Sequence, residues 1–337
     1  MNQIDWDTLT FSLTPAKSMF ISHWEKDTFW TDGKLIPFGD ISMSPAAGVL
    51  NYGQGIFEGM KAYRTTKKRI VLFRPDKNIE RATLSAERLC IPVVHSDLFM
   101  DGLFKVVKDN VDFIPPSDKG SLYIRPIIWG TGPVLGVAPA QSYTFLIYVS
   151  PVGPYFKSGI RCLNLRVTNK FHRAAPRGVG NFKTIGNYAA SLYPQKLAKS
   201  AGFDEVIYLN AGNENFIEEV GSANLFIVKD NVITTPPLTG SILPGVTRDS
   251  VIHIARDILN MKVEERSIPL EELMGADEVF CTGTAVSVTP IGQITSDDAV
   301  GIIHKNQIGK ITQTLNIELT SIQKELKDDP FDWLIQV

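Results

Sequence analysis

Residues 178–191 read GVGNFKTIGNYAAS and place a single lysine, Lys183, among small and flexible residues. Gly178, Gly180 and Gly186 flank it, so the backbone on both sides can approach a ligand closely and adopt positive φ angles. Lys183 stands apart from any run of charges, which argues against a purely solubilising role. A lysine in such surroundings suits two chemistries: phosphate binding in a glycine loop, or imine formation with a carbonyl cofactor.

The composition is that of a globular protein long enough for two domains. Its 337 residues are 44% hydrophobic and 21% charged. There are 34 basic and 36 acidic residues, and this balance, without a basic block, argues against a nucleic-acid partner. The apolar runs are too short to cross a membrane, and the N-terminus lacks the basic and apolar regions of a secretory signal.

Cysteine and histidine usage indicates a reducing compartment and no metal site. The three cysteines are odd in number and far apart, so they fit neither a disulfide framework nor a zinc site. The five histidines include no HExxH motif and no pair at i,i+4. We therefore expect a cytoplasmic protein without a metal centre or a histidine-based catalytic triad.

Two elements in the first half of the chain carry polar side chains of interest. Asn78 is predicted to cap a helix, which puts Arg81 in the first turn. A cation there opposes the helix dipole, so we expect Arg81 to face an anion. Residues 121–129 (SLYIRPIIW) are predicted to form a strand whose period of two places Tyr123 and Arg125 on one face.

The second half of the chain contains two turns suited to anion binding. Residues 241–260 are predicted to form a turn and an amphipathic helix, whose N-terminus, at 245–247, offers free N–H groups to a phosphate. A strand and turn at 277–285 can present further N–H groups. A last helix is expected at 307–327, with Trp333 anchoring the C-terminus.

The segment 151–159 (PVGPYFKSG) is the predicted linker, because prolines and glycines stand there between strong strand signals. It separates a small N-terminal α/β domain, 1–150, from a large C-terminal domain, 160–337, that carries Lys183. Helical signals, among them 189–201, mix with strand signals on both sides. The fold class is therefore α/β, of the mixed α+β kind.

Two nucleotide-binding patterns can be weighed against imine formation. The glycines of GQGIFEG (53–59) have the spacing GxGxxxG and follow no apolar strand, so a turn at a site wall is a better interpretation than a dinucleotide loop. Phe182 stands where a P-loop requires glycine before its lysine. Imine formation by Lys183 is thus the better supported chemistry.

A pyridoxal 5'-phosphate (PLP) site needs a phosphate cradle, an acid at the pyridine nitrogen and a group on the phenolic oxygen. Arg81 and residues 245–247 could hold the phosphate. Glu218 or Glu219 could keep the ring nitrogen protonated, and Tyr188 could donate to the phenolic oxygen. Residue types alone do not choose between the two glutamates.

Motifs along nearly the whole chain are similar to those of the branched-chain amino acid aminotransferases, a family of fold-type IV PLP enzymes, in its larger form. The resemblance implies two α/β domains with the active site between them, a PLP cofactor and a homodimer. The motifs stand in the family's order: YGQGIFEGMKAYR, LFRPDKNIERA, SLYIRP, PVGPYF, GNFKTIGNYAAS, EVGSANLFIV, ILPGVTRDS and CTGTAVSVTP.

The resemblance implies that Lys183 is the catalytic residue, bonded to the cofactor and later moving the proton between substrate and cofactor. It selects Glu219 for the ring nitrogen and Tyr188 for the phenolic oxygen. Further cofactor-binding positions are implied at Arg81, Leu243, Val246, Thr247 and Thr284.

The substrate-binding positions follow from the same resemblance. Arg125, with Tyr52, is implied to accommodate the second carboxylate of glutamate, and a loop with Leu135 and Val137 to reach the neighbouring subunit's site. The remaining positions are Phe57, Tyr123 and Tyr155 around the branched side chain, and Thr284 and Ala285 at the substrate carboxylate. Val286 and Thr289 replace the cysteines of a redox CxxC found in animal relatives, so that thiol regulation is not expected.

The implied reaction is transfer of the amino group of L-leucine, L-isoleucine or L-valine to 2-oxoglutarate by a ping-pong mechanism. It yields branched 2-oxo acids and L-glutamate. A D-amino acid aminotransferase or an aminodeoxychorismate lyase is the alternative within the fold class, and would differ around Tyr52, Arg125 and Thr284. A catalytically silent PLP carrier would need neither the substrate-side aromatic residues nor Arg125.

Overall fold

The computed structural model of the chain describes residues 4–153, 161–297 and 299–337. Its contacts divide the chain into two units. The first comprises Met1–Lys157, Phe182–Gly186 and Ile322–Val337, and the second comprises Ser158–Asn181 and Asn187–Ser321. Most of the expected linker lies outside the described residues, and the domain bounds stay a prediction. The mixed α/β fold class is confirmed.

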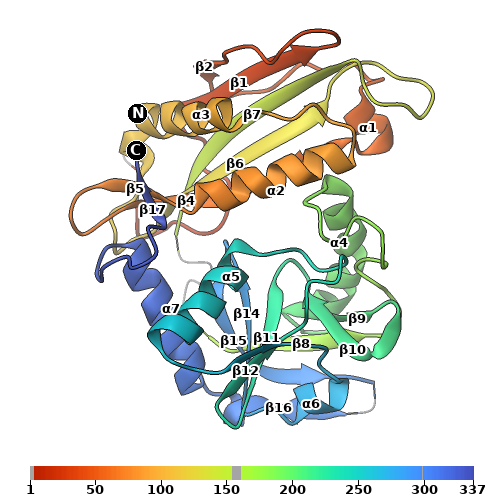
Figure 1. Ribbon diagram of the computed structural model, residues 1–337, viewed down its shortest axis with the longest axis vertical. Coiled ribbons are helices and arrows are strands. Elements are labelled where there is room, and N and C mark those ends of the chain that lie inside the picture. The colour runs from red at the N-terminus through yellow and green to blue at the C-terminus, as the bar shows by residue number, and fades with distance from the viewer. Residues whose placement is uncertain (1–3, 154–160, 298) are drawn as a thin grey trace. The chain divides into compact units, whose positions relative to one another are not determined.

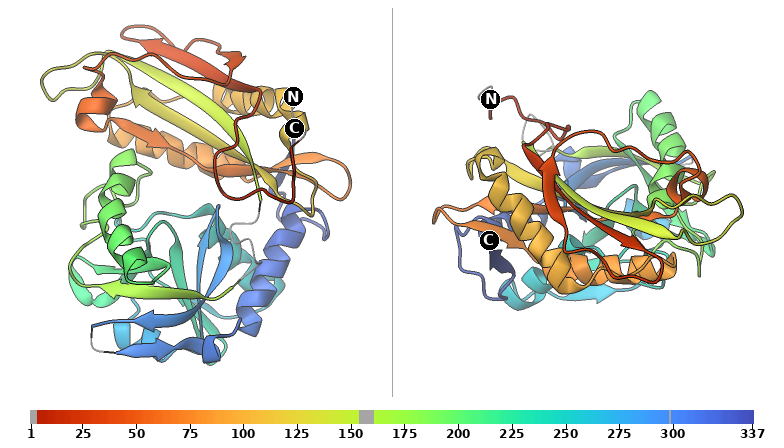
Figure 2. Two further views of the ribbon diagram at one scale, coloured as in Figure 1. Left: turned by 180° about the vertical axis from the view of Figure 1, so that it is seen from behind. Right: turned by 90° about the horizontal axis from the view of Figure 1, so that it is seen from above.

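The first unit is built on an antiparallel sheet whose central strands are β6 (Ser121–Gly130) and β7 (Ser142–Val152). Strands far apart in sequence lie side by side in it, such as β1 (Ser18–Glu25) against β7 (Figure 2). The full order is β17 (Leu334–Gln336), β5 (Ile70–Phe73), β4 (Met60–Arg64), β6, β7, β1 and β2 (Lys34–Pro37), with β3 (Gly55–Phe57) also paired to β6.

Two helices, α2 (Pro75–Arg88) and α3 (Ser96–Asp109), pack on one face of this sheet (Figure 1). Alternation along β6 buries Leu122 and Ile124 in the shared core and puts Tyr123 and Arg125 on the other face, as predicted. The unit also contains a short helix, α1 (Gly48–Tyr52), and a 3-10 turn at Val111–Phe113.

The predicted start of the Arg81 helix is wrong. α2 begins at Pro75, whose fixed φ suits the first helical position, and Arg74 precedes it in the left-handed region with φ 50°. Asn78 therefore lies inside the helix and Arg81 in its second turn. The argument from the helix dipole does not apply to Arg81, which is buried for another reason, described below.

The second unit contains a mixed sheet of nine strands. Its parallel pairs are β8 with β9, β8 with β15, and β12 with β13. The order is β10 (Asn213–Val220), β9 (Glu205–Asn210), β8 (Leu163–Thr168), β15 (Ser287–Thr295), β14 (Glu278–Gly283), β11 (Asn224–Lys229), β12 (Val232–Thr235) and β13 (Val263–Glu265), with β16 (Val300–Ile302) beside β15.

Helices of the second unit differ from the sequence predictions mainly in their bounds. α4 (Ile185–Ser200) begins before the predicted start at 189, and Pro194 lies inside it. α5 (Val246–His253) starts at the predicted place and continues into a π-helical segment, Ile254–Ile258. The other helices are α6 (Leu270–Met274), the 3-10 turn Ile303–Asn306 and α7 (Lys310–Gln323).

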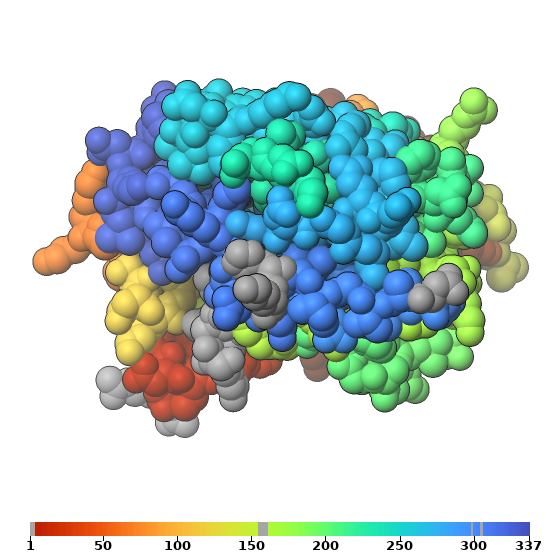
Figure 3. Space-filling model, turned by 90° about the horizontal axis from the view of Figure 1, so that it is seen from below, coloured from red at the N-terminus to blue at the C-terminus, as the bar shows by residue number. Residues whose placement is uncertain are grey.

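Cyan and blue segments from the C-terminal part of the chain make up most of the face in Figure 3. Across the described ranges, no helix has the length and apolar character needed to cross a membrane.

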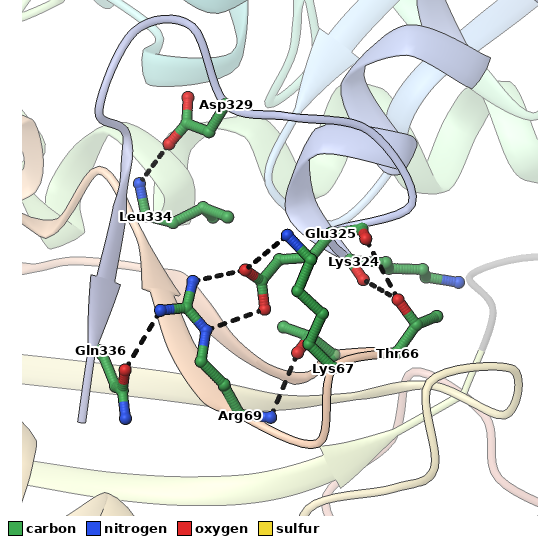
Figure 4. Close-up of polar contacts among 9 residues, drawn as sticks. Thr66, Lys67, Arg69, Lys324, Glu325, Asp329, Leu334 and Gln336 are labelled. Carbon is green, nitrogen blue, oxygen red and sulfur yellow. Dashed lines mark hydrogen bonds and ion pairs between the residues drawn. The ribbon is translucent and has the colours of Figure 1, made fainter.

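The end of the chain is tied back to the first sheet by a set of polar contacts (Figure 4). Arg69 binds the buried Glu325 carboxylate at both oxygens. Its Nε donates to Oε2 at 3.1 Å, and its Nη2 donates to Oε1. Thr66 donates from its N–H to the Lys324 carbonyl at 3.1 Å. Trp333 is buried, as predicted, and its ring lies 4.7 Å from the Arg74 guanidinium.

Substituting Glu325 with glutamine should destabilise the fold. Glu325→Gln keeps the shape but loses the charge that Arg69 pairs with, so we expect the free energy of unfolding to fall by about 1–2 kcal/mol in urea denaturation at pH 7. Asp101→Asn breaks an exposed i,i+4 pair with Lys105 and serves as the control, with an expected change below about 0.5 kcal/mol. Equal losses in both variants would contradict this account of the C-terminal tie.

Candidate functional site

The backbone of Lys183 is held on both sides by the first unit. Its N–H donates to Ser85 Oγ on α2 at 2.9 Å, and its carbonyl accepts the N–H of Phe57 on β3 at 3.2 Å. The next residue, Thr184, forms an antiparallel bridge with Ile56. These contacts leave the backbone of the lysine little freedom.

A buried ion pair lies in the same unit. Arg81 donates from Nε to Glu58 Oε1 and from Nη2 to Oε2, both at 2.8 Å, and Asn78 Nδ2 donates to Oε2 at 2.7 Å. Asn78 and Arg81 are three apart, on one face of α2. Burial opposes the charge of Glu58, which is 1% exposed, but Arg81, Lys183 and Asn78 together outweigh that effect, so the pKa of this carboxyl lies below its ordinary value.

The side-chain amine of Lys183 is set among charged and aromatic groups. Its Nζ lies 4.5 Å from the centre of the Phe57 ring, and the Arg125 guanidinium lies 4.8 Å from the same ring. Burial of the ammonium group is the main cause that lowers the pKa of Lys183 to about 8, followed by the charge of Arg81. Glu58 acts in the opposite direction. Lys183 as a whole is half-buried.

Tyr123 and Arg125 are brought together on the face of β6 that the sequence predicted. Arg125 Nη2 donates to the Tyr123 hydroxyl at 3.0 Å, and the guanidinium also lies over the Tyr123 ring at 5.2 Å. Gly59 is required beside them, because a Cβ there would lie only 2.1 Å from the Tyr123 hydroxyl oxygen.

Tyr52 contacts the loop that carries Leu135 and Val137, in the first unit. The Tyr52 hydroxyl donates to the Leu135 carbonyl. Leu135 and Val137 are 95% and 87% exposed, so this loop carries two apolar residues at the surface. Tyr155, the other aromatic residue expected in the pocket, lies outside the described residues.

In the second unit, Glu219 is the centre of a buried polar cluster. Asn224 Nδ2 donates to Glu219 Oε2 at 3.1 Å and to the Leu243 carbonyl at 2.9 Å, while the Leu243 N–H donates to Oε1 at 3.4 Å. Arg173 forms an ion pair with Oε1. Glu218 is also buried, but alternation turns it to the other face of β10, where Asn210 Nδ2 donates to it at 2.6 Å.

The start of α5 is packed against this cluster. A Cβ on Gly245, the residue before the helix, would lie 2.1 Å from Asn224 Oδ1, so the chain enters the helix in close contact with that amide. Val246 and Thr247 are the first two helical residues and are both buried. An N-terminus of this kind offers N–H groups to an anion.

The other expected positions also lie in the second unit. Thr284 and Ala285 form the turn between β14 and β15, and Thr282 just before it pairs with Asn224 in the sheet. Tyr188 lies in the first turn of α4, where its carbonyl accepts a hydrogen bond from Ser191 Oγ at 2.8 Å.

Sequence reasoning missed four groups that hold these side chains, Glu58 and Ser85 in the first unit and Arg173 and Asn224 in the second, and it took Asn78 for a helix cap. Glu58 had one visible signal, since it is the only charged residue in GQGIFEG. The others have common residue types, and no local pattern identifies their partners, whether these lie five residues away, as Glu219 does from Asn224, or 98, as Lys183 does from Ser85.

Comparisons with known proteins agree on one family. The amino-transferase class IV family model matches residues 55–294. The chloroplastic branched-chain-amino-acid aminotransferase 5 of Arabidopsis thaliana is 50% identical, over 99% of this chain and 80% of that protein. The crystal structure of the Escherichia coli branched-chain amino acid aminotransferase superposes with a TM-score of 0.82 at 30% identity, over 95% of this chain and 99% of that one.

A second solved structure carries a ligand. It is a branched-chain amino acid aminotransferase from T.th., complexed with N-(5'-phosphopyridoxyl)-L-glutamate. It superposes with a TM-score of 0.80 at 29% identity, over 95% of this chain and 98% of that one.

The comparisons overturn the expectation of a cytoplasmic protein. Relatives from Arabidopsis thaliana and Humulus lupulus that are 48–50% identical are chloroplastic proteins, which points to an organelle. The prediction rested on the reduced state expected for scattered cysteines. That property does not distinguish one reducing compartment from another.

The amine of Lys183 should titrate far below an ordinary lysine in protein freed of cofactor. Since burial and Arg81 both favour the neutral form, we expect its labelling by acetic anhydride to rise with pH and reach half its maximum at about pH 8. Mass spectrometry of the peptide containing Lys183 measures this, with the exposed Lys196 as the internal reference for reagent reactivity. A midpoint at or above about pH 10 would contradict the described surroundings of the amine.

Proposed function

The chain belongs to the class IV aminotransferases, as a branched-chain-amino-acid aminotransferase that uses PLP, and from this premise we propose that Lys183 carries the cofactor and moves the proton during transamination. The enzyme acts on branched-chain amino acids. We further infer that 2-oxoglutarate accepts the amino group in a ping-pong cycle. One observation carries the proposal: the backbone of Lys183 is fixed by two hydrogen bonds, and burial lowers the pKa of its amine to about 8.

The residues present fit PLP in their chemistry. The first unit supplies an amine that can be neutral and a buried guanidinium, Lys183 and Arg81. The second supplies the buried carboxylate of Glu219 and the helix start at Val246 and Thr247. An aldehyde, a phosphate and a protonated pyridine nitrogen need partners of these kinds.

Each residue then has a distinct task. When bound, PLP draws electrons from the substrate and stabilises the charge left when the proton on Cα departs. Lys183 Nζ accepts that proton and returns it, since an amine with a pKa of about 8 can both hold and release it near neutral pH. Glu219 holds the proton on the ring nitrogen, and Arg81 binds the phosphate. Tyr188 donates to the phenolic oxygen.

The substrate pocket must accept an aliphatic side chain and a carboxylate in turn. Phe57 and the Tyr123 ring offer apolar surface, while Arg125 offers a charge that is already engaged with both rings and with the Tyr123 hydroxyl. A guanidinium kept on aromatic faces leaves room for an aliphatic chain and can still pair with a carboxylate. Thr284 and Ala285 would bind the carboxylate common to all substrates through backbone N–H groups.

A homodimer is part of the proposal. Leu135 and Val137 are exposed at the tip of a loop that Tyr52 holds through the Leu135 carbonyl. Two such apolar side chains at the surface would be buried if the loop reached a second subunit's site.

Replacing Lys183 should abolish turnover. Lys183→Ala removes the only group proposed to bond PLP and move the proton, so we expect activity to fall by at least about 1,000-fold and the visible absorption of the bound cofactor to disappear. Transamination of L-leucine and an absorption spectrum measure the two effects. Lys196→Ala, an exposed change on α4, should leave both intact. Activity near the wild-type level in Lys183→Ala would refute the assignment.

Replacing Arg125 should separate the two substrate classes. Arg125→Met keeps an unbranched chain of similar reach but removes the charge, so kcat/KM for L-glutamate should fall by about 10- to 100-fold, the value of a lost charge-assisted hydrogen bond. The value for L-leucine should change by less than about threefold, because an aliphatic side chain needs no cation there. Equal losses on the two substrates would contradict the role of Arg125.

A further inference from the structure

The Glu58 carboxylate is buried and fully engaged, although the proposed chemistry gives it no task. Its two oxygens accept both hydrogen bonds from Arg81, one from Asn78 and one from the Gly59 N–H at 3.2 Å. Both side chains of the ion pair are nearly inaccessible, with 1% of the Glu58 side chain and 8% of the Arg81 side chain exposed. An arrangement of four donors around one carboxylate leaves the guanidinium a single orientation.

Stability alone is a weak reason for such a pair. The cost of removing two charges from water largely offsets their attraction, and apolar residues of similar size often serve as well. What the pair does supply is a guanidinium fixed at two of its nitrogens, on the helix that also holds the Lys183 backbone through Ser85.

We propose that Glu58 is a positioning residue for the cofactor: it holds the Arg81 guanidinium in the orientation that receives the phosphate, and it balances the charge of Arg81 beside the Lys183 amine. This rests on the proposed function, in which Arg81 binds the phosphate and Lys183 bonds the cofactor. Glu58 touches neither substrate nor cofactor in this role, and it acts through Arg81.

The two parts of the role have different physical signatures. Orientation of Arg81 affects how tightly PLP binds, because a guanidinium that must be reordered loses part of its interaction with the phosphate. Charge balance affects the lysine, since Glu58 raises the pKa of Lys183 and Arg81 lowers it. Removing the negative charge therefore leaves the effect of Arg81 unopposed, and the pKa of Lys183 should fall further.

The test uses Glu58→Gln, which keeps the shape and removes the charge. In protein freed of cofactor, titration with PLP should give a Kd raised by at least about tenfold, and the labelling midpoint of Lys183 should move down by about half a pH unit or more. Glu80→Gln, on the same helix, breaks only an exposed pair with Lys77 and should change neither quantity. A Kd within twofold of the wild type together with an unmoved midpoint would overturn the proposal.

Two further variants keep the test decisive if Glu58→Gln folds poorly. Glu58→Asp retains the charge but is too short to span both nitrogens of Arg81, so it should weaken PLP binding and leave the Lys183 midpoint near the wild-type value. In an Arg81→Gln background, adding Glu58→Gln should weaken PLP binding by less than about twofold, because the residue it acts through is gone. Full additivity of the two substitutions would overturn the role through Arg81.

The same experiments distinguish failure of this proposal from failure of the proposed function. If Lys183→Ala retains the visible absorption of bound PLP, the proposed function fails whatever Glu58 does. If PLP bonds to Lys183 and the Glu58 variants bind it as the wild type does, the role of Glu58 alone is refuted.

Discussion

The hydrogen bonds that hold the backbone of Lys183 are the constraint on which the rest of the first unit's site depends. Ser85 accepts the N–H, and the Phe57 N–H donates to the carbonyl, so the lysine is fixed between α2 and β3. Residues 182–186 group by contacts with the first unit, although the residues on either side group with the second. A nucleophile must be held in place to react efficiently. Here two hydrogen bonds hold the backbone of the nucleophile.

The second unit shows the same principle with a carboxylate at its centre. Asn224 joins Glu219 to Leu243 through the two hydrogen bonds of one amide, and its oxygen lies against the start of α5. One side chain thus couples the proposed acid to the proposed phosphate-binding turn. Because the cluster is buried, each unmade hydrogen bond would be costly, and a small change at Asn224 should disturb both functions together.

The parts that local pattern predicts correctly are those that local physics determines. Period-two alternation put Tyr123 and Arg125 on one face, and the helical stripe with its glycine turn located the start of α5. The helix of Arg81 was misplaced because Asn78 resembles a cap, whereas Pro75 starts the helix and Asn78 donates to Glu58 instead. The partners of Arg81 and Glu219 could not be predicted, since the sequence separation within each pair carries no signal. Only the family resemblance had chosen Glu219 over Glu218.

The amine of Lys183 shows why opposing effects matter more than any single contact. Burial and Arg81 both destabilise its ammonium form, and Glu58 restores part of it, so that the pKa comes to about 8. If burial were the only influence, the pKa of the amine would depend on how deeply it is buried, and small movements change that depth. If the charge of Arg81 were not opposed by Glu58, the amine would hold less firmly the proton that it must later return. Burial makes the largest contribution, and the Glu58 carboxylate, fixed on the Arg81 guanidinium, offsets part of it, so the amine can serve as proton acceptor and donor near neutral pH.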